Sequence, residues 1–592
     1  MKKSKESIRT QILSYTNQIW GTKKIERLDP LVQMMVGTLA NELYLIQNKL
    51  GDIDTVLLER IAREITPEKC VSVRPAHTVL QMIPKEPSVT LKQSCEFALE
   101  WSLTGNSQEL ETISFYPITD FKLHNAAIES LFYRNQLYLF DENGKKQWKA
   151  DAETPLKSTF VWIGLDMKIK IKKMSELSFY LDFPHLSEIH ELYDVLPYTK
   201  CFINGKEVRL KQGLPLPKQP ITEADADILR YYNNHYLTID EDINVSTWEV
   251  ENVPKALSGI IDPKEAENLS PKHWLCLEFP SYFTADILQN MDIAMNAFPV
   301  VNRKLVETTI AKNNLLKTIT LTSELGEKLL SVESAIDNKK RILVPDTITG
   351  NNEAGTYHIE TIYDAFIEQF SLTDYVEQLL DLVDDERAVF SDINRSKIEQ
   401  VLFGLTENDN VGTHKLDVNN RGREDEVSCL SINPHEKTTS VAFSYWLTYG
   451  ERINGISAGK TFTPNKSTTF DGLFATSLCE IHGAKEFTDI QDIMSVNQYI
   501  LTSKDRIVSE YNIKCFCESE LGRAIEKVEI ELGGKVSPKP KEGLVRVLNI
   551  HLTPSQGNSE LLYRKGVLKS LKMRMKSRSP EDYLYEIRMV GM

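Results

Sequence analysis

The stretch Asp29–Pro84 reads DPLVQMMVGTLANELYLIQNKLGDIDTVLLERIAREITPEKCVSVRPAHTVLQMIP and contains the strongest periodic signal in the chain. Its first half places apolar residues at steps of three and four, which puts them along one stripe of a helix. That stripe consists of Val32, Met35, Leu39, Leu43, Ile46 and Leu50. Asp29-Pro30 favours a helix start, because an acidic residue suits the positive end of a helix and proline suits its first turn.

A second helix is predicted directly after the first one. Gly51-Asp52 ends the first helix, and Asp54 can cap the second, which runs to Pro67 with its own apolar side. Two such helices form a hairpin with more apolar surface than the pair alone can bury. Either the protein's own sheets cover that surface, or a partner subunit supplies part of the cover.

Composition excludes several classes of protein. The chain has 592 residues, 26% of them charged and 9% aromatic, which is typical of a soluble protein with about four domains. A net charge of −15 argues against a generic nucleic-acid binder, because such proteins need clustered lysine and arginine. No apolar run reaches the length of a membrane span, and the basic N-terminus lacks the apolar core of a signal peptide. The eight scattered cysteines fit reduced thiols in a cytosol.

The remaining patterns predict an α+β, multidomain fold whose middle domains are β-rich. Asn143-Gly144 and Asn204-Gly205 indicate tight hairpin turns, and Thr222 with Asp225 indicates a capping-box-like helix start. The pattern of residues 375–405 is helical, and that of residues 406–426 is typical of a polar loop. The expected domains are an N-terminal helical region (1–84), a β-rich domain (85–220), a mixed α/β domain (221–370), a helix plus β-rich region (371–490) and a C-terminal α+β domain (491–592).

The C-terminal domain gives the clearest order of elements. Thr502 or Ser503 can cap a helix that continues through Ser509–Leu521, and two alternating strand segments follow it. A further helix then precedes a closing strand. If Tyr499–Leu501 is also a strand, the order is β-α-β-β-α-β, the split arrangement of a ferredoxin-like domain.

Gly455–Thr461 fits two catalytic patterns at once. As G-x-S-x-G it would make Ser457 the nucleophile of a serine hydrolase, with a downstream histidine as base. That chemistry needs a strand before the serine and a helix after it, and Pro464 and the β-branched threonines oppose such a helix. As a phosphate loop it has Asn454 where the first glycine belongs. We therefore expect a glycine turn between two strands and no catalytic residue.

Metal and cofactor sites are not expected either. His185, Glu188 and His190 resemble a metal cluster, but histidines five residues apart diverge around a helix. Cys515 and Cys517 point about 200° apart if they lie on a helix, so they cannot share a metal ion.

Seven basic residues lie between Arg564 and Arg578 with no acidic residue among them. A solvated helix face is the simplest interpretation of such a run. Among functional interpretations an acidic partner subunit is favoured, because neighbouring strands would cover the apolar side and leave no face for a membrane. The candidate partner interface therefore combines the N-terminal stripe with Lys569, Lys572 and Arg574.

Short motifs that follow one another in order resemble the TssF family, a baseplate subunit of bacterial type VI secretion systems that is related to wedge proteins of contractile phage tails. They span nearly the whole chain. The motifs are Asp29-Pro30, Arg74-Pro75, Leu192-Tyr193-Asp194, Pro299-Val300-Val301-Asn302, Val344-Pro345-Asp346 and Asp505-Arg506-Ile507-Val508. Thr66-Pro67-Glu68 stands where the family often has an aromatic-Pro-His group, and Ala297-Phe298 where it often has Cys-Thr, so a divergent subtype is indicated.

The resemblance implies a cytoplasmic scaffold without cofactors, docked at the inner-membrane secretion complex. Two copies of such a chain would join one TssG-like subunit into a wedge, with a TssE-like sheath initiator and TssK-like adaptors attached, around a VgrG-like spike hub. The baseplate would template tube and sheath growth and pass on the signal for contraction. Alternatives are a wedge protein of a phage tail or extracellular injection particle and, from another class, a hydrolase using Ser457.

Overall fold

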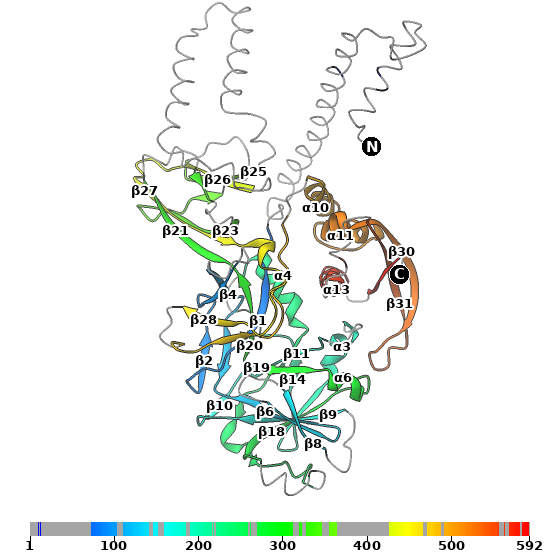
Figure 1. Cartoon of the computed structure of the whole chain (residues 1–592). Coiled ribbons are helices and arrows are strands. Elements are labelled where there is room, and N and C mark those ends of the chain that lie inside the picture. Colours follow the sequence, from blue (N-terminus) through cyan, green and yellow to red (C-terminus); the bar gives the residue numbers. More distant parts are fainter. Residues whose placement is uncertain are drawn as a thin grey trace, which may run out of the picture.

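The computed structural model describes most of the chain from residue 73 onward. The predicted N-terminal helical hairpin, the predicted helix 375–405 and residues 406–425 of the predicted polar loop lie outside the described residues. The described residues are 10, 12, 39, 73–102, 110–140, 146–151, 159–184, 190–215, 217, 221–258, 261, 269–311, 319–321, 327–345, 354–363, 426–465, 470–486, 490–555, 562, 567–580 and 583–590. This part of the chain is α+β and strand-rich, as expected (Figure 1).

Six antiparallel strands close into a barrel near the centre of the structure. Their order is β1-β20-β4-β3-β28-β29, and β29 pairs with β1. Every residue of the strand AFPVVN is buried, which explains why its sequence is a continuous apolar run rather than an alternating one. The strands are β1 His77–Gln81, β3 Glu96–Trp101, β4 Glu111–Pro117, β20 Ala297–Asn302, β28 Thr461–Asn465 and β29 Ala475–Ser477.

Two further sheets pack face to face and share one hydrophobic core, which includes Ile163, Phe179 and Leu275 without solvent exposure. The longer sheet contains β13 Lys206–Val208, β12 Lys200–Ile203, β18 Lys272–Glu278, β9 Phe160–Asp166, β6 Ala127–Tyr133, β7 Gln136–Phe140 and β8 Lys146–Asp151, with β17 Val250–Glu251 also on β18. The shorter contains β14 Leu210–Gln212, β15 Tyr236–Ile239, β11 Ser178–Asp182 and β19 Asp292–Met295. We call these two sheets and the barrel the β core.

Short elements complete the β core. Two ribbons pair β2 Ser88–Leu91 with β5 Phe121–His124 and β10 Lys173–Met174 with β16 Ile243–Asn244. The helices are α3 His190–Val195, α4 Glu223–Asn233 and α6 Ala285–Gln289, and the 3-10 turns are η3 Leu196–Tyr198, η4 Val245–Thr247 and η7 Gly450–Ile453.

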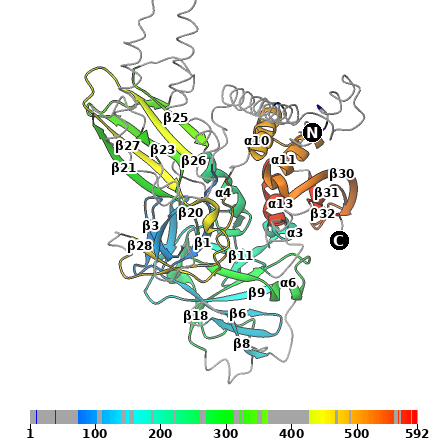
Figure 2. The ribbon, with the colours of Figure 1, turned by 45° about the horizontal axis from the view of Figure 1, so that its top comes forward.

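A second sandwich extends from the barrel on the side opposite the two-sheet core (Figure 2). Buried residues of both its sheets, among them Ile432 and Phe443, form one core. The first sheet contains β21 Lys304–Ala311, β27 Ser440–Thr448 and β23 Lys328–Asp337. The other contains β22 Ile319–Thr320, β26 Glu426–Asn433, β25 Thr356–Tyr363 and β24 Val344–Pro345.

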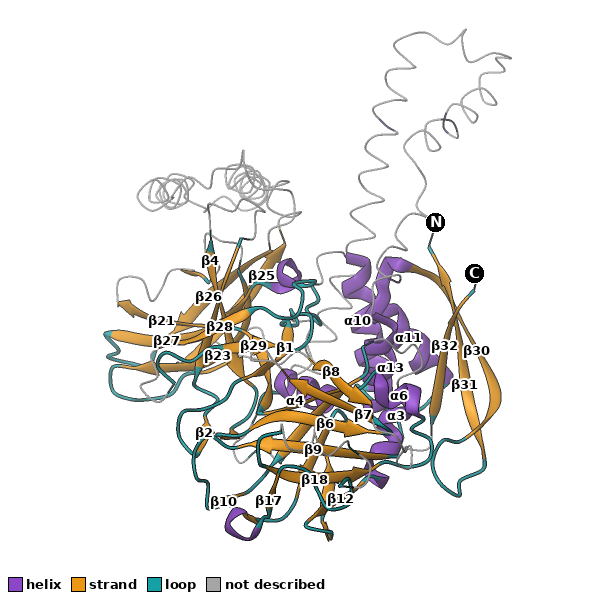
Figure 3. Ribbon diagram, turned by 60° about the horizontal axis from the view of Figure 1, so that its bottom comes forward, coloured by secondary structure: helices purple, strands orange, loops and turns teal. Residues whose placement is uncertain are grey.

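Residues 490–590 form a C-terminal unit in which helices separate a three-stranded sheet from the β core (Figure 3). The sheet order is β30-β31-β32; β30 and β31 are antiparallel, whereas β31 and β32 are parallel. The elements are α10 Ile490–Ser503, α11 Glu510–Leu521, η8 Gly522–Ala524, β30 Ile525–Val536, β31 Leu544–Pro554, α13 Val567–Ser577 and β32 Leu584–Met589.

The conditional ferredoxin-like arrangement is corrected by this order. Tyr499–Leu501 belongs to α10, so the described unit runs α-α-β-β-α-β and its sheet lacks the first of the four predicted strands. Val496, Tyr499 and Ile500 pack into the core of the unit at helical spacing, a period that a three-residue segment cannot display. Thr502 and Ser503 end this helix, and Ser509 caps the next one in a capping box with Asn512.

Two local predictions are confirmed. At Asn204-Gly205, Ile203 pairs with Lys206 and both turn residues have positive φ, 49° and 74°, the conformation that favours Asn-Gly in a hairpin. Thr222 caps α4, its hydroxyl oxygen accepting from the backbone N–H of Asp225 at 3.1 Å. Asn143-Gly144 lies outside the described residues, although the flanking strands β7 and β8 do pair antiparallel.

Asn302, at the end of β20, joins the barrel to the second sandwich. Its side-chain oxygen accepts from the Thr448 hydroxyl at 2.8 Å and from the Tyr449 backbone N–H at 3.0 Å, and its amide donates to the Ser114 carbonyl at 3.0 Å. The side chain is almost fully buried. Its removal would break three buried hydrogen bonds and leave the Tyr449 N–H without its acceptor away from water, which is costly.

We therefore expect Asn302→Ala to lower the free energy of unfolding by at least about 2 kcal/mol, measured by thermal and urea unfolding. Asn338→Ala is the matched control, because Asn338 is exposed and accepts one hydrogen bond from the Thr439 N–H. Equal losses in the two variants would contradict the role of Asn302 as a joint.

Candidate functional site

The C-terminal unit faces the β core across a cleft of about 2340 Å³. One wall consists of α13 and the end of α11; the other consists of α4, β11, β19 and the segment 474–485. Helices α13 and α4 are in contact, so the two parts meet directly at this level (Figure 1). Charged side chains from both walls converge here.

The first ion pair joins Arg74, three residues before β1, to Glu520 on α11. The guanidinium forms a bidentate contact, with both nitrogen–oxygen distances 3.0 Å. Backbone bonds between Arg74 and Lys485 fix the start of this segment, and the Lys485 ammonium donates to the Glu520 carbonyl at 2.7 Å. A cation at that point suits the negative end of α11.

A second group of ion pairs joins α13 to α4. Asp227 accepts a hydrogen bond from Arg574 at 2.9 Å on one carboxylate oxygen, and its other oxygen forms an ion pair with Arg578 at 2.7 Å. Arg578 also binds Asp505 at 2.7 Å, and Arg574 lies 3.7 Å from Glu520. The two groups are therefore continuous, and we call Arg74, Asp227, Glu520, Arg574 and Arg578 the ionic joint.

One more pair lies beside the ionic joint. Lys576 on α13 contacts Asp194 on α3. Two residues in the last turn of α13, Arg574 and Lys576, thus reach two different helices of the β core. This restrains rotation of the C-terminal unit as well as its separation.

Burial changes the pKa values of the joint. Burial alone would raise the pKa of Glu520, but the positive charges of Arg74 and Lys485 outweigh it and hold that pKa below its usual value. Burial lowers the pKa of Lys485 to about 8, against the opposing effect of Glu520. Glu520 therefore stays ionised at neutral pH and keeps its attraction for the surrounding cations.

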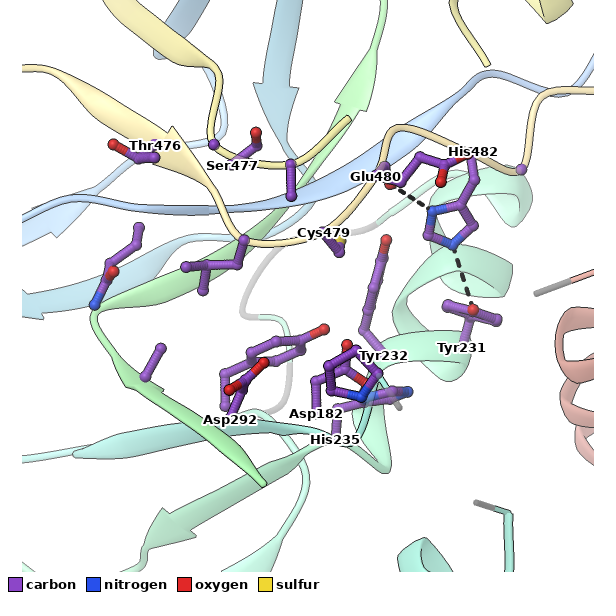
Figure 4. Close-up of a pocket in the computed structure, with 18 of the residues that line it drawn as sticks. Asp182, Tyr231, Tyr232, His235, Asp292, Thr476, Ser477, Cys479, Glu480 and His482 are labelled. Carbon is purple, nitrogen blue, oxygen red and sulfur yellow. Dashed lines mark hydrogen bonds and ion pairs between the residues drawn. The ribbon is translucent and has the colours of Figure 1, made fainter. Parts of the chain in front are cut away.

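Deeper in the cleft, histidine and tyrosine rings pack together (Figure 4). The His77 ring shares a 2.8 Å hydrogen bond with the Tyr232 hydroxyl and lies 4.6 Å from the ring of His482, centroid to centroid. His482 in turn lies 3.3 Å from the Tyr231 hydroxyl. These contacts connect β1 and the 474–485 segment to α4, which carries Asp227 of the ionic joint.

The ring cluster continues to β11 and α3. His235 lies 4.1 Å from the ring of Tyr193, and the Tyr193 hydroxyl donates to Asp182 at 3.0 Å. Tyr180 stacks on His235 at 5.7 Å. The cluster therefore braces the same two helices, α3 and α4, that the ionic joint uses.

His77 depends on a glycine next to it. A Cβ on Gly483 would lie 2.1 Å from the His77 ring, and Gly483 has a φ of +89°. Glycine is required there both for space and for backbone conformation. Burial lowers the pKa of His77 well below its usual value, assisted by His482 and Arg74, so the ring is neutral in the folded protein.

The predicted partner-interface residues fall into two groups. Val32, Met35, Leu43, Ile46 and Leu50 lie outside the described residues, and Leu39 is helical and 51% exposed. On α13, Lys572 is half-buried, and Arg574 belongs to the ionic joint with 14% of its side chain exposed; of Lys569 only the backbone is described. The basic helix thus meets acidic groups of its own chain, and partner contact by these residues stays a prediction.

The sequence motifs mark several of the joints. Arg74 takes part in an ion pair between the two walls of the cleft, Asp194 contacts Lys576, and Asn302 joins the barrel to the second sandwich. Asp505 holds Arg578 within the C-terminal unit. Sequence reasoning did not identify Glu520 as the partner of Arg74, or Asp227 as the partner of Arg574. The run of basic residues on α13 was noticed, but its simplest interpretation was a solvated face, and an acidic partner subunit was favoured only among the functional interpretations.

Ser457 lies exposed in a loop that follows the 3-10 turn η7 and precedes β28. A nucleophile elbow requires the reverse context, a strand before the serine and a helix after it. Among the described residues no group of histidine, cysteine, aspartate and glutamate side chains could hold a metal ion, whereas His185 and Glu188 lie outside that part. Cys515 and Cys517 do lie on a helix, α11, and both are buried.

We expect Arg74→Met to destabilise the contact between the C-terminal unit and the β core by about 2 kcal/mol. The substitution removes the bidentate partner of the Glu520 carboxylate, which is partly buried. Thermal unfolding and limited proteolysis would measure the loss, and Arg74→Met/Glu520→Gln should recover part of it. Lys255→Met is the control, since the Lys255 side chain is 83% exposed in its ion pair with Glu249. A melting temperature equal to the control would refute the joint.

His77 should make stability dependent on pH in one direction. As the pH falls through about 6.5, the unfolded chain binds a proton that the folded ring resists, so the stabilisation is complete above that pH and declines below it. The melting temperature of the wild type should therefore fall more between about pH 7.5 and about pH 5 than that of His77→Gln. Parallel pH profiles for the two proteins would show that the ring does not contribute.

Among the helices of the described part, none has both the length and the apolar character needed to cross a bilayer.

No family model and no curated protein matches the sequence. Solved structures do match. A chain of the type VI secretion system TssK-TssF-TssG baseplate subcomplex is 11% identical with a TM-score of 0.43, over 94% of this chain and 96% of that one. A chain of the baseplate complex from the type VI secretion system is 9% identical with a TM-score of 0.39, over 99% of this chain and 96% of that one. The protein is thus similar, over nearly its whole length, to chains of type VI baseplates.

Proposed function

We propose that this protein is a structural subunit of a type VI secretion baseplate and a divergent member of the TssF family. The observation that carries the proposal is the ordered series of short motifs along the chain, because Arg74, Asp194 and Asn302 each stand at a contact between separate parts of the structure. Residues that fix the relative positions of domains are what a load-transmitting scaffold requires.

The architecture supports a mechanical role. Figure 2 shows the barrel, the sheets and the C-terminal unit as neighbouring parts. Polar contacts at Asn302 and in the ionic joint connect these parts. Directional contacts such as bidentate ion pairs fix orientation, whereas apolar packing is non-directional. We propose that the protein works without catalysis or cofactor, and that it holds its partners at set angles.

The proposed partners are those of a baseplate wedge. Two copies of this chain join one TssG-like subunit, a TssE-like sheath initiator and TssK-like adaptors attach to the wedge, and the wedges surround a VgrG-like spike hub. The assembly is cytoplasmic and docks at the inner-membrane secretion complex, where it templates tube and sheath growth and transmits the signal for contraction.

The N-terminal stripe is the proposed contact with the TssG-like subunit. The sequence pattern predicts that its six apolar residues share one helix face, and such a stripe needs a cover to leave water. Leu39, the member of the stripe that the structure describes, is half exposed. A helix in a groove of the partner would provide the cover.

A wedge protein of a phage tail or an extracellular injection particle is the second candidate, because the family that the motifs resemble is related to such wedge proteins. Genes for membrane-complex subunits next to this one favour the secretion system, and genes for a capsid or tail fibres favour the particle.

Co-expression with the TssG-like product of the neighbouring gene tests the proposal. We expect a stable complex whose mass, measured by native mass spectrometry, contains two copies of this chain. Leu39→Glu should reduce co-purification at least about tenfold, because it puts a charge into the apolar contact.

The control is Asn41→Glu, two positions further and about 200° around the same predicted helix. The melting temperature of each variant alone shows that folding is intact. A chain that stays monodisperse beside every neighbouring gene product would remove the proposal, and equal binding by both variants would remove the stripe from it.

A further inference from the structure

Strand β30 forms an open edge of the C-terminal sheet. It is 12 residues long, and among the described strands it pairs with β31 alone. Three large apolar residues on this hairpin, Leu532, Val536 and Leu544, are 70%, 71% and 78% exposed. Val536 lies opposite Leu544 in the ladder, and Leu532 shares their face. Soluble proteins usually protect such edges with charge, proline or a covering element.

The exposed residues continue a core that the helices cover only in part. Val528, on the same face of β30, is buried under the helices, whereas the residues beyond it project past them. From Val528 to Val536 the ladder with β31 runs without a bulge. A two-fold axis at Leu532 would pair Val528–Val536 of one copy with the same residues of the second copy, within a regular register that begins at Lys527.

That two-fold arrangement is self-complementary. In an antiparallel pair centred on Leu532, Leu532 meets Leu532, Val528 meets Val536, and on the opposite face Glu529 meets Lys535, each contact occurring twice. A pair centred on Glu531 would instead oppose two glutamates and place Lys527 against Lys535. Opposite charges across strands are stabilising and like charges destabilising, so the charges select the register centred on Leu532 over that one.

Glycine at position 534 fits the same arrangement. A Cβ there would have no neighbour nearer than 3.8 Å, and the backbone is not in the left-handed region. Nothing in the described part of the chain therefore requires glycine at this point of the strand. In the two-fold pair Gly534 lies opposite Ile530 of the second copy, where the absence of a side chain leaves room for the larger residue.

We infer that β30 is the surface through which two copies of this chain associate, by antiparallel β30–β30 pairing about Leu532 into a continuous six-stranded sheet. The inference deepens the proposed function, on which it rests for the presence of two copies in one assembly. Main-chain hydrogen bonds supply affinity in such strand addition, and the paired side chains set the register.

Cysteine cross-linking of the full-length chain tests the register directly. In Leu532→Cys the two thiols face each other across directly opposed residues, whose Cα atoms lie about 4.5–5.5 Å apart, within the range of a disulfide. Val536→Cys is the matched control, because Val536 is as exposed as Leu532 but would face Val528. We expect Leu532→Cys to form a disulfide dimer at least about tenfold faster than Val536→Cys. The wild type measures the background of dimers that form through the native cysteines.

A charge exchange gives a second readout. Glu529→Lys and Lys535→Glu should each weaken dimerisation, measured by analytical ultracentrifugation, and the double variant should restore it. Within one chain the double variant places its introduced lysine beside Lys527 and its introduced glutamate beside Glu586, which is unfavourable. Restoration can therefore come only from contacts between copies.

Equal cross-linking of the two cysteine variants, or no cross-linking of either, would overturn the inference. A disulfide between the introduced thiol of Leu532→Cys and a different protein would also overturn it. The outcome is distinguishable from failure of the proposed function. If the Leu532→Cys chain binds its TssG-like partner but forms no disulfide dimer, only the strand pairing is refuted. If it forms the disulfide dimer but binds no baseplate partner, only the baseplate role is refuted.

Discussion

One partly buried carboxylate, Glu520, determines how the two halves of the described structure are held. It carries a bidentate bond to Arg74 of the β core and lies near Arg574, whose main partner, Asp227, again belongs to the β core. A charge in that position is stable only while its partners stay in place, because removing one of them leaves the other poorly solvated. The contact is therefore sensitive to geometry, and it fixes an angle as well as a distance.

The ring cluster and the ionic joint act on the same helices, which makes the cleft a single mechanical element. His77 and His482 hold the barrel against α4, and Tyr193 holds α3 against β11. Forces applied to the C-terminal unit would pass through α13 to α3 and α4 and from there into both sheets of the β core. This path would be useful in an assembly that must convert a signal at one subunit into a movement at another, and it requires no chemistry.

Local sequence patterns predicted what short-range physics controls. The Asn-Gly turn at Asn204-Gly205 and the Thr222 cap were identified correctly because their conformation depends on a few adjacent residues. The strand predicted at Tyr499–Leu501 was wrong because three apolar residues cannot distinguish a strand from one face of a helix. The basic run on α13 was recognised and was expected to face solvent or a partner. The ion pair between Arg574 and Asp227 was not predicted, because Asp227 lies several hundred residues away in the sequence.

The sequence by itself determined the fold class, the β-rich middle, the absence of a credible catalytic context at Ser457 and a resemblance carried by ordered motifs. Only the tertiary structure decided that β1, β20 and β28 share one barrel, that Arg74 and Glu520 face each other, and that β30 ends as an open edge. The physical reason is the range of the interactions involved. Turns and caps are set within a few residues, whereas strand order, ion-pair partners and open edges depend on which distant segments are brought together, and no local pattern records that choice.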